Sequence, residues 1–159
     1  MITLANSIKL ADFFYSLFKY KTKEKVASSK KLSNLEYALS LQKENNFEKA
    51  LKLYQEFEKN PFLTENEKST IYNNITVCLY KLGKYQEAKA YFYKLFALQK
   101  ALYFKDHEYY TITYAYTLAM GIEWFGLKKE DYSSFLENVI KDFYFLEDAK
   151  RLQKIIQSL

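Results

Sequence analysis

Few side chains in this sequence are suited to catalysis or metal binding. Cys78 is the only cysteine and His107 is the only histidine among 159 residues. A metal site built from several histidines is therefore excluded, and a single thiol cannot form an internal disulfide. Cys78 lies in an apolar segment with no histidine nearby in the sequence to deprotonate it. This setting predicts a buried packing residue rather than a nucleophile.

The remaining titratable residues predict helix ends rather than catalysis. His107 stands between Asp106 and Glu108 where a helix is expected to begin, a position typical of a solvated or capping residue. Two acidic pairs lie near other expected helix starts, where they complement the helix dipole: Glu130-Asp131 and Glu147-Asp148. The sequence has no glycine-rich phosphate loop. We therefore predict a protein that is not an enzyme and that uses no cofactor or metal.

The composition predicts an all-α protein. Only three Gly and one Pro interrupt the chain, whereas 49% of its residues are hydrophobic. So few chain breakers cannot supply the many tight turns of a β structure. The length suits one domain with a real core, and no run of about 18 apolar residues predicts a membrane span. Together with the absence of a signal-peptide pattern and the single cysteine, these features predict a cytoplasmic protein.

The net charge of +5 is concentrated in the first 31 residues. They hold seven Lys against Asp12 and Glu24, whereas the rest of the chain has 17 basic and 17 acidic residues. We predict a separate region at 1–31, consisting of an amphipathic helix at 3–20 and a Lys-rich linker. The stripe of this helix is Leu4, Ile8, Ala11, Tyr15 and Phe18. The region could bind an anionic membrane surface or form a homodimer, or it could be a solvated helix end and linker. Because 23 Lys accompany one Arg, nucleic acid is not an expected partner.

The region 32–159 contains a sequence repeat with a period of 38 residues. Residues 45–54 read NNFEKALKLY, and residues 83–92 read GKYQEAKAYF. Each copy places a turn residue, an aromatic, an alanine and a second aromatic at the same spacing, and each follows an apolar-periodic segment. This pattern predicts stacked helical hairpins.

Caps and turns define the expected helices. Residues 33–36 and 64–67 fit capping boxes, and the turns are expected at Asn45-Asn46, Gly83 and Gly126. The expected helices are 34–44 (or from an earlier start), 47–59, 65–81, about 85–104, 107–124, 129–143 and 145–158.

At the repeat positions the chain resembles the tetratricopeptide repeat family. The first copy matches at Tyr37, Ala38, Leu41, Phe47, Ala50, Tyr54 and Pro61. The second copy matches at Tyr72, Ile75, Thr76, Leu79, Gly83, Tyr85, Ala88 and Phe92. The resemblance is good over about 33–98 and weaker over a degenerate third repeat at 107–143. It implies an α-solenoid of antiparallel hairpins, with an extra N-terminal helix and a C-terminal capping helix.

The resemblance also implies a concave groove that binds a protein or peptide. The predicted groove residues lie on the first helix of each hairpin: Leu35, Glu36, Leu39, Lys43, Asn73, Asn74, Val77, Tyr80, Lys81, Tyr116, Thr117, Met120, Glu123 and Trp124. This mixed apolar and amide surface suits a peptide with apolar anchors. Some family members hold a C-terminal carboxylate in this groove with Lys, Arg and Asn. Here only Asn74, with Asn73 beside it, matches such a clamp, and the basic residues are absent.

These features predict a non-enzymatic protein–protein interaction module, either a small adaptor or a dedicated chaperone. Tyr116 and Trp124 are expected to contribute to partner binding, because Tyr and Trp are enriched at binding hot spots. Two alternatives remain. One is a peripheral membrane-associated scaffold that uses the basic N-terminus. The other is an immunity or inhibitor protein that blocks a toxin or enzyme.

Overall fold

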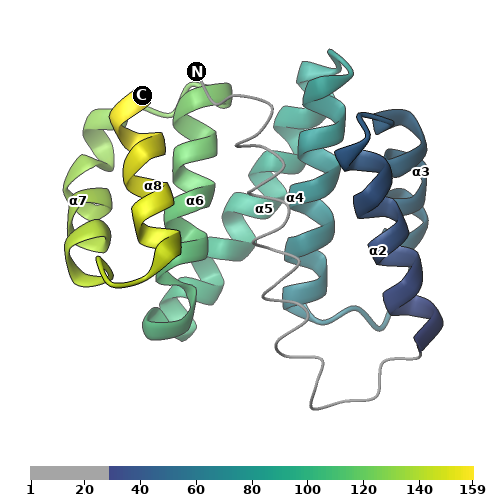
Figure 1. The fold of residues 1–159 in the computed structure, drawn as a ribbon, viewed down its shortest axis with the longest axis horizontal. Coiled ribbons are helices and arrows are strands. Elements are labelled where there is room, and N and C mark those ends of the chain that lie inside the picture. The colour runs from purple at the N-terminus through teal and green to yellow at the C-terminus, as the bar shows by residue number, and fades with distance from the viewer. Residues whose placement is uncertain (1–28) are drawn as a thin grey trace. The chain divides into compact units, whose positions relative to one another are not determined.

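The computed structural model describes residues 29–159, so the amphipathic helix expected at 3–20 lies outside the described part. The described residues form seven α-helices and one short 3-10 helix, without a strand (Figure 1). The helices are α2 (Ser29–Lys43), α3 (Phe47–Glu58), α4 (Glu65–Lys81), α5 (Tyr85–Lys105), α6 (His107–Phe125), η1 (Lys129–Asp131), α7 (Ser133–Asp142) and α8 (Glu147–Ser158). The predicted all-α class is confirmed for this part of the chain. None of these helices combines the length and apolar character needed to cross a membrane.

The described chain forms two compact units that divide within α5, between Leu95 and Phe96. We call residues 29–95 the N-terminal unit and residues 96–159 the C-terminal unit. The first contains α2, α3, α4 and the first half of α5, and the second contains the rest of α5 with α6, α7 and α8.

In the N-terminal unit, α3 packs against both α2 and α4 (Figure 1). The alanine and the second aromatic of the first repeat copy, Ala50 and Tyr54, are fully buried, as are Ile75 and Leu79 of α4. A buried alanine lets neighbouring helices approach closely, while a large aromatic fills the space beside it. The repeat pattern thus marks core positions.

The two predicted turns of the repeat are confirmed and have the same hydrogen bonds. After α2, the Asn46 amide donates to the Leu41 carbonyl at 2.8 Å. After α4, the Lys84 amide donates to the Leu79 carbonyl at 2.9 Å. Both are the long bond of a Schellman motif, which satisfies a carbonyl left open at a helix end.

One predicted capping box is confirmed and one is wrong. Thr64 Oγ1 accepts from the Glu67 amide at 3.2 Å, and Glu67 Oε2 accepts from the Thr64 amide at 2.8 Å. By contrast, α2 begins at Ser29, so Ser33 lies inside this helix and is not its N-cap. Residues 30–32 are two Lys and a Leu, which favour helix, so nothing stops the helix at Ser33.

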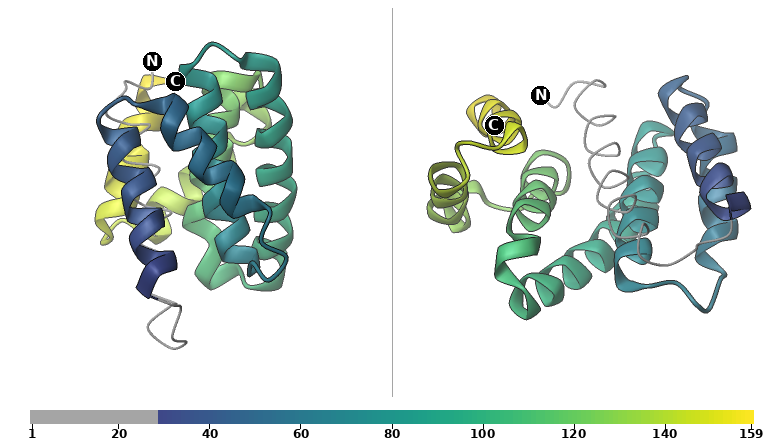
Figure 2. Two further views of the ribbon diagram at one scale, coloured as in Figure 1. Left: turned by 90° about the vertical axis from the view of Figure 1, so that its right-hand side faces the viewer. Right: turned by 60° about the horizontal axis from the view of Figure 1, so that its bottom comes forward.

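In the C-terminal unit, α6, α7 and α8 pack against one another in all three pairings. The right panel of Figure 2 looks nearly along these three helices and shows them side by side. Their shared core is fully buried and includes Ala115 and Leu118 of α6, Leu136 of α7 and Leu152 of α8.

The helix expected at 129–143 is interrupted. Residues 129–131 form the 3-10 turn η1, and α7 starts only at Ser133. Tyr132 separates them with φ −125° and ψ −5°, outside the helical range. The other expected helices agree with the structure to within about two residues at each end, which is the usual uncertainty of a helix boundary.

Candidate interaction surface

Cys78 has a structural environment. Its side chain is fully buried in α4, and Sγ lies 3.8 Å from Oε1 of Gln42 in α2. Burial raises the pKa of the Cys78 thiol to about 12, so the thiol stays protonated at neutral pH. Because the thiolate is the reactive form, Cys78 is an inert packing residue, as predicted.

His107 is also placed as expected, at the start of α6. It is exposed and follows the N-cap residue Asp106, whose Oδ1 accepts from the Tyr109 amide at 3.0 Å. The imidazole stacks on the Tyr103 ring, with centroids 4.4 Å apart. In residues 29–159 no group of three His, Cys, Asp or Glu side chains comes close enough to hold a metal ion.

The acidic pairs lie in the first turns of η1 and α8, as predicted. Glu147 and Asp148 each pair with a base one turn further along α8, namely Lys150 at 3.9 Å and Arg151 at 3.8 Å. Burial raises the pKa of Asp148, while the nearby Arg151 opposes this effect. At these positions the carboxylates complement the positive end of the helix dipole.

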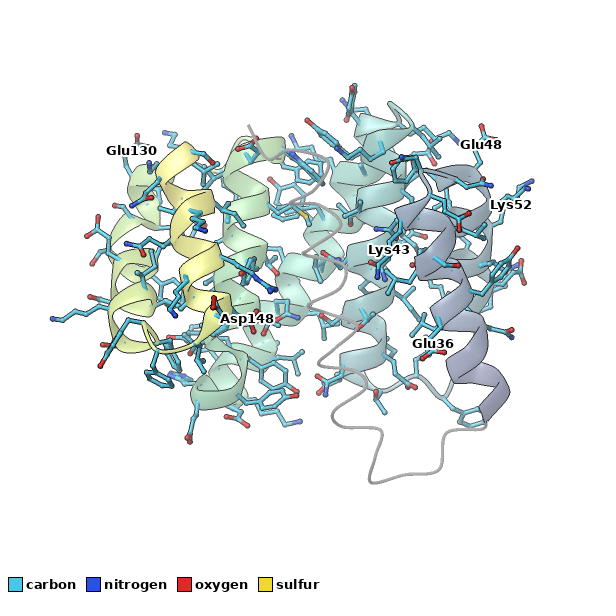
Figure 3. All side chains as sticks on the ribbon, in the orientation of Figure 1. Glu36, Lys43, Glu48, Lys52, Glu130 and Asp148 are labelled. Carbon is cyan, nitrogen blue, oxygen red and sulfur yellow. The ribbon has the colours of Figure 1, made fainter. Side chains whose placement is uncertain are left out.

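Nine of the predicted groove residues belong to the N-terminal unit. On α2, Leu35 and Leu39 are buried, whereas Glu36 and Lys43 are exposed. Figure 3 shows Glu36 and Lys43 along α2, seven positions and hence about two turns apart, so they share one face. The α2 part of this surface thus combines buried leucines with charged side chains at its edge.

The α4 part of the surface is a row of buried residues that we call the amide strip: Asn73, Asn74 and Val77. All three are at most 1% exposed. Asn73 Nδ2 donates to Asn74 Oδ1 at 3.4 Å, and Asn73 Oδ1 has no hydrogen-bond partner. A buried amide oxygen without a partner lowers the stability of the fold, and a hydrogen bond from a donor on another molecule would remove this penalty.

The amide strip ends near Tyr80 and Lys81, which are partly buried at the last turn of α4. The Tyr80 ring meets the Tyr85 ring edge to face, with centroids 5.0 Å apart. Burial lowers the pKa of Lys81. This end of α4 therefore offers an aromatic ring and a partly desolvated ammonium group.

The other five predicted groove residues belong to the C-terminal unit and are mostly enclosed there. Tyr116, Thr117 and Met120 are buried in α6. The Tyr116 hydroxyl donates to the Asp148 carbonyl at 2.7 Å and so ties α6 to the start of α8. Glu123 and Trp124 are partly buried at the end of α6. Tyr116 thus has a structural role that the sequence did not suggest.

Gln42 was not predicted from the sequence, although it lies beside the strip. It is fully buried in α2, and its Nε2 has no hydrogen-bond partner, while its Oε1 faces the Cys78 thiol. The only sequence feature that indicates a buried side chain at Gln42 is its place between apolar positions of a helix. The N-terminal unit therefore contains one buried amide donor without a partner, Gln42 Nε2, and one buried amide acceptor without a partner, Asn73 Oδ1.

A second cluster that the sequence did not reveal joins α3, α4 and α5. The Tyr91 hydroxyl donates to Glu58 Oε2 at 2.6 Å, and Lys94 Nζ lies 3.7 Å from Glu58 Oε1. Lys94 also lies over the Tyr91 ring, 4.4 Å from its centroid, and the centroids of the Tyr91 and Tyr72 rings are 6.1 Å apart. Burial, followed by the bond to Glu58, raises the pKa of Tyr91. These contacts hold α3, α4 and α5 together, and α4 is the helix that carries the amide strip.

Comparisons with known proteins give no family for this chain: no protein-family model matches it, and no curated protein or solved structure matches it.

Proposed function

We propose that this protein is a non-enzymatic interaction module that binds a polypeptide segment along the amide strip of α4. The observation that carries the proposal is the unpartnered Oδ1 of Asn73, which is fully buried beside Asn74. A polypeptide backbone presents one N–H donor and one C=O acceptor at each non-proline residue. An asparagine side chain can bind both, because it carries a carbonyl acceptor and an amide donor.

The residues around the strip define the kind of segment that fits. Val77 extends the strip with an apolar side chain, and α2 adds Leu35 and Leu39 with Glu36 and Lys43 at the edge. Such a surface favours a segment with apolar anchors, oriented by a few polar contacts.

The resemblance to tetratricopeptide repeat proteins supports the same proposal. The two turns related by 38 positions have matching hydrogen bonds, as expected for copies of one structural unit. We infer that the hairpins stack as in that family, and that the chain is a cytoplasmic adaptor or dedicated chaperone. The membrane alternative depends on residues 1–31, nearly all of which lie outside the described part. The inhibitor alternative has no specific contact in its favour.

Selection of random linear peptides on the immobilised full-length protein tests the proposal. Peptides enriched on the wild type should bind Asn73→Leu about fivefold to tenfold more weakly, because about one hydrogen bond to the peptide is lost. The matched control is Gln86→Leu, which makes the same amide-to-leucine change at an exposed position of α5.

Equal affinity of the selected peptides for the wild type and Asn73→Leu would contradict the proposed site. Failure to enrich any peptide would contradict the proposed function itself. Far-UV circular dichroism of each variant establishes that a loss of binding does not come from unfolding.

A further inference from the structure

We propose that two copies of this chain form a dimer through the hairpin of α7 and α8, with the turn of each copy seated in a groove of the other. The turn connects the two helices at residues 143–146, and we call it the aromatic turn. The groove lies between the same two helices, and we call it the α7–α8 groove. Both surfaces belong to the C-terminal unit, so the inference depends neither on the amide strip nor on the proposed function.

The aromatic turn carries rings at positions where turns seldom have them. The Leu146 amide donates to the Phe143 carbonyl at 2.9 Å and closes the turn. Tyr144 and Phe145 therefore occupy the two central positions, which are usually Gly, Pro, Asn, Asp or Ser. Tyr144 is 70% exposed and Phe145 is 64% exposed, and their ring centroids are 5.9 Å apart. Two large apolar side chains are thus exposed to solvent on a turn whose backbone is already ordered.

The α7–α8 groove offers apolar surface that the unit leaves partly uncovered. It has a volume of about 350 Å³, and its apolar lining consists of Leu136, Ile140 and Ile156. Leu136 is fully buried, whereas Ile140 and Ile156 remain partly exposed. Because pockets of about 300–1,000 Å³ accept drug-sized molecules, this groove has room for an aromatic side chain.

A two-fold axis brings both turns to both grooves. Because α7 and α8 are antiparallel neighbours, the aromatic turn lies at one end of their hairpin (Figure 1). The middle of the groove, at Leu136, precedes Tyr144 by eight positions and thus lies about 12 Å back along α7. When a second hairpin lies antiparallel against the first, each turn faces the groove of the other copy. Such a self-complementary contact closes on itself and is the commonest arrangement of soluble dimers.

The buried area favours this pairing over a one-sided contact. A large aromatic side chain buries about 150–250 Å² when it is fully covered. With about two thirds of each ring exposed, four rings contribute roughly 400–700 Å², and the surfaces that face them add a similar area. The total of roughly 800–1,400 Å² reaches the size of a specific interface, whereas one turn in one groove would bury half as much.

The charged residues at the edges of the two surfaces can pair between copies. Lys129 and Glu137 line the groove, and Lys141 and Asp142 precede the turn. None of these four side chains makes an ion pair with another residue of the range 29–159. Each surface therefore supplies one base and one acid, so that a base of either copy has an acid to face. Charges of this kind help to fix the register of an interface.

Analytical ultracentrifugation of the full-length protein tests the dimer. From about 10 to 500 µM, the range of a weak interface, the average mass should rise from one chain towards two. The double variant Tyr144→Ser with Phe145→Ser keeps residues suited to a turn and should weaken the association at least about tenfold. The control Phe104→Ser removes a ring that is 65% exposed near the end of α5 and should leave the association unchanged.

A second double variant tests the groove. Ile140→Gln with Ile156→Gln leaves the turn intact and should also weaken the association. A mixture of the turn variant and the groove variant restores one turn in one groove, so it should associate more strongly than either variant alone. Circular dichroism and thermal melts of each variant establish that the hairpin is still folded.

A wild-type protein that stays monomeric at every concentration would overturn the proposal. Association that persists in the turn variant would also overturn it, because another surface would then join the copies. Masses that grow beyond two chains would contradict the two-fold arrangement, since a one-sided contact does not close. A mixture that associates no better than its components would show that the turn and the groove do not meet.

Discussion

Asn45 and Gly83 stand 38 positions apart and adopt the same left-handed backbone conformation, with φ of 62° and 75°. Asn45 follows α2 and Gly83 follows α4, and each lets the chain turn into the second helix of its hairpin. Glycine adopts this conformation without steric cost, whereas any side chain is strained there and asparagine is strained least.

Substitutions at these two turns should therefore have opposite effects. Asn45→Gly should raise the free energy of unfolding by about 0.5 kcal/mol, and Gly83→Ala should lower it by about 1 kcal/mol. A Cβ at Gly83 would meet no atom within 4 Å, so the loss would come from the backbone conformation alone. Urea denaturation followed by circular dichroism measures both changes. Gly83→Asn is the control and should cost less than Gly83→Ala; the reverse order would contradict this account of the turn.

Tyr91 should make the stability depend on pH in the alkaline range. Burial and the bond to Glu58 raise the pKa of Tyr91 in the folded protein, whereas an unfolded tyrosine titrates near pH 10. Above pH 10 the unfolded chain thus loses a proton that the folded chain keeps, and the free energy of unfolding falls as the pH rises. Tyr91→Phe should be less stable at neutral pH by about 1 kcal/mol and should show a smaller decline between pH 9 and about pH 11.

The control for this experiment is Tyr85→Phe, which removes the hydroxyl of a tyrosine that is exposed in the same helix. It should leave both the neutral stability and the alkaline decline nearly unchanged. A decline that is identical in the wild type and in Tyr91→Phe would show that other groups determine the alkaline stability.

Tyr116 should be a stability residue of the C-terminal unit. Tyr116→Phe removes the hydroxyl that donates to the Asp148 carbonyl at 2.7 Å and should cost about 1 kcal/mol. Tyr116→Ala also empties a buried ring site and should cost about 3–5 kcal/mol. Thermal melts of both variants measure this difference. If Tyr116→Ala does not lower the melting temperature, the ring contributes little to the stability of the C-terminal unit. Partner binding would then be left as the main role of Tyr116.

Cys78 should be protected from alkylation in the native protein. At pH 8 the thiol is almost entirely protonated, because its pKa is about 12, and the side chain is fully buried. Mass spectrometry after iodoacetamide treatment should find no adduct under native conditions and complete modification in denaturant. Rapid alkylation of the native protein would show that α4 opens readily and would argue against an enclosed amide strip.

The features that the sequence predicted correctly are governed by local interactions. Thr64 and Glu67 are three residues apart and cap α4 by themselves, and Gly83 determines its turn without help from distant residues. The capping box at 33–36 was wrong because a Ser-x-x-Glu pattern caps a helix only if the chain leaves the helix before it, and residues 30–32 favour helix. Local patterns therefore locate most helix ends but do not exclude a longer helix.

The contacts that form the candidate site could not be predicted, because they join residues far apart in the chain. Gln42 reaches Cys78 across 36 positions, and Tyr91 reaches Glu58 across 33. The position of Tyr116 against α8 likewise depends on how three helices pack. Periodicity identifies the buried face of each helix, but it does not say which buried polar group finds a partner. The unpartnered oxygen of Asn73 became visible only in the structure.

Asn73 and Asn74 should respond differently to the same substitution. Asn73→Leu removes a buried oxygen that has no partner, but it also removes the donor to Asn74 Oδ1, so the number of unpartnered groups stays the same and the free energy of unfolding should change little. Asn74→Leu removes the acceptor of the Asn73 amide, leaves a second unpartnered group and should lower this free energy by about 1 kcal/mol. Urea denaturation of both variants measures the contrast, with Gln86→Leu as the exposed control. If Asn73→Leu is as stable as the wild type but binds selected peptides more weakly, Asn73 is retained for binding rather than for stability. A loss of stability in Asn73→Leu as large as that in Asn74→Leu would instead mean that the Asn73 oxygen has a partner in the free protein, and the amide strip would then be part of the core.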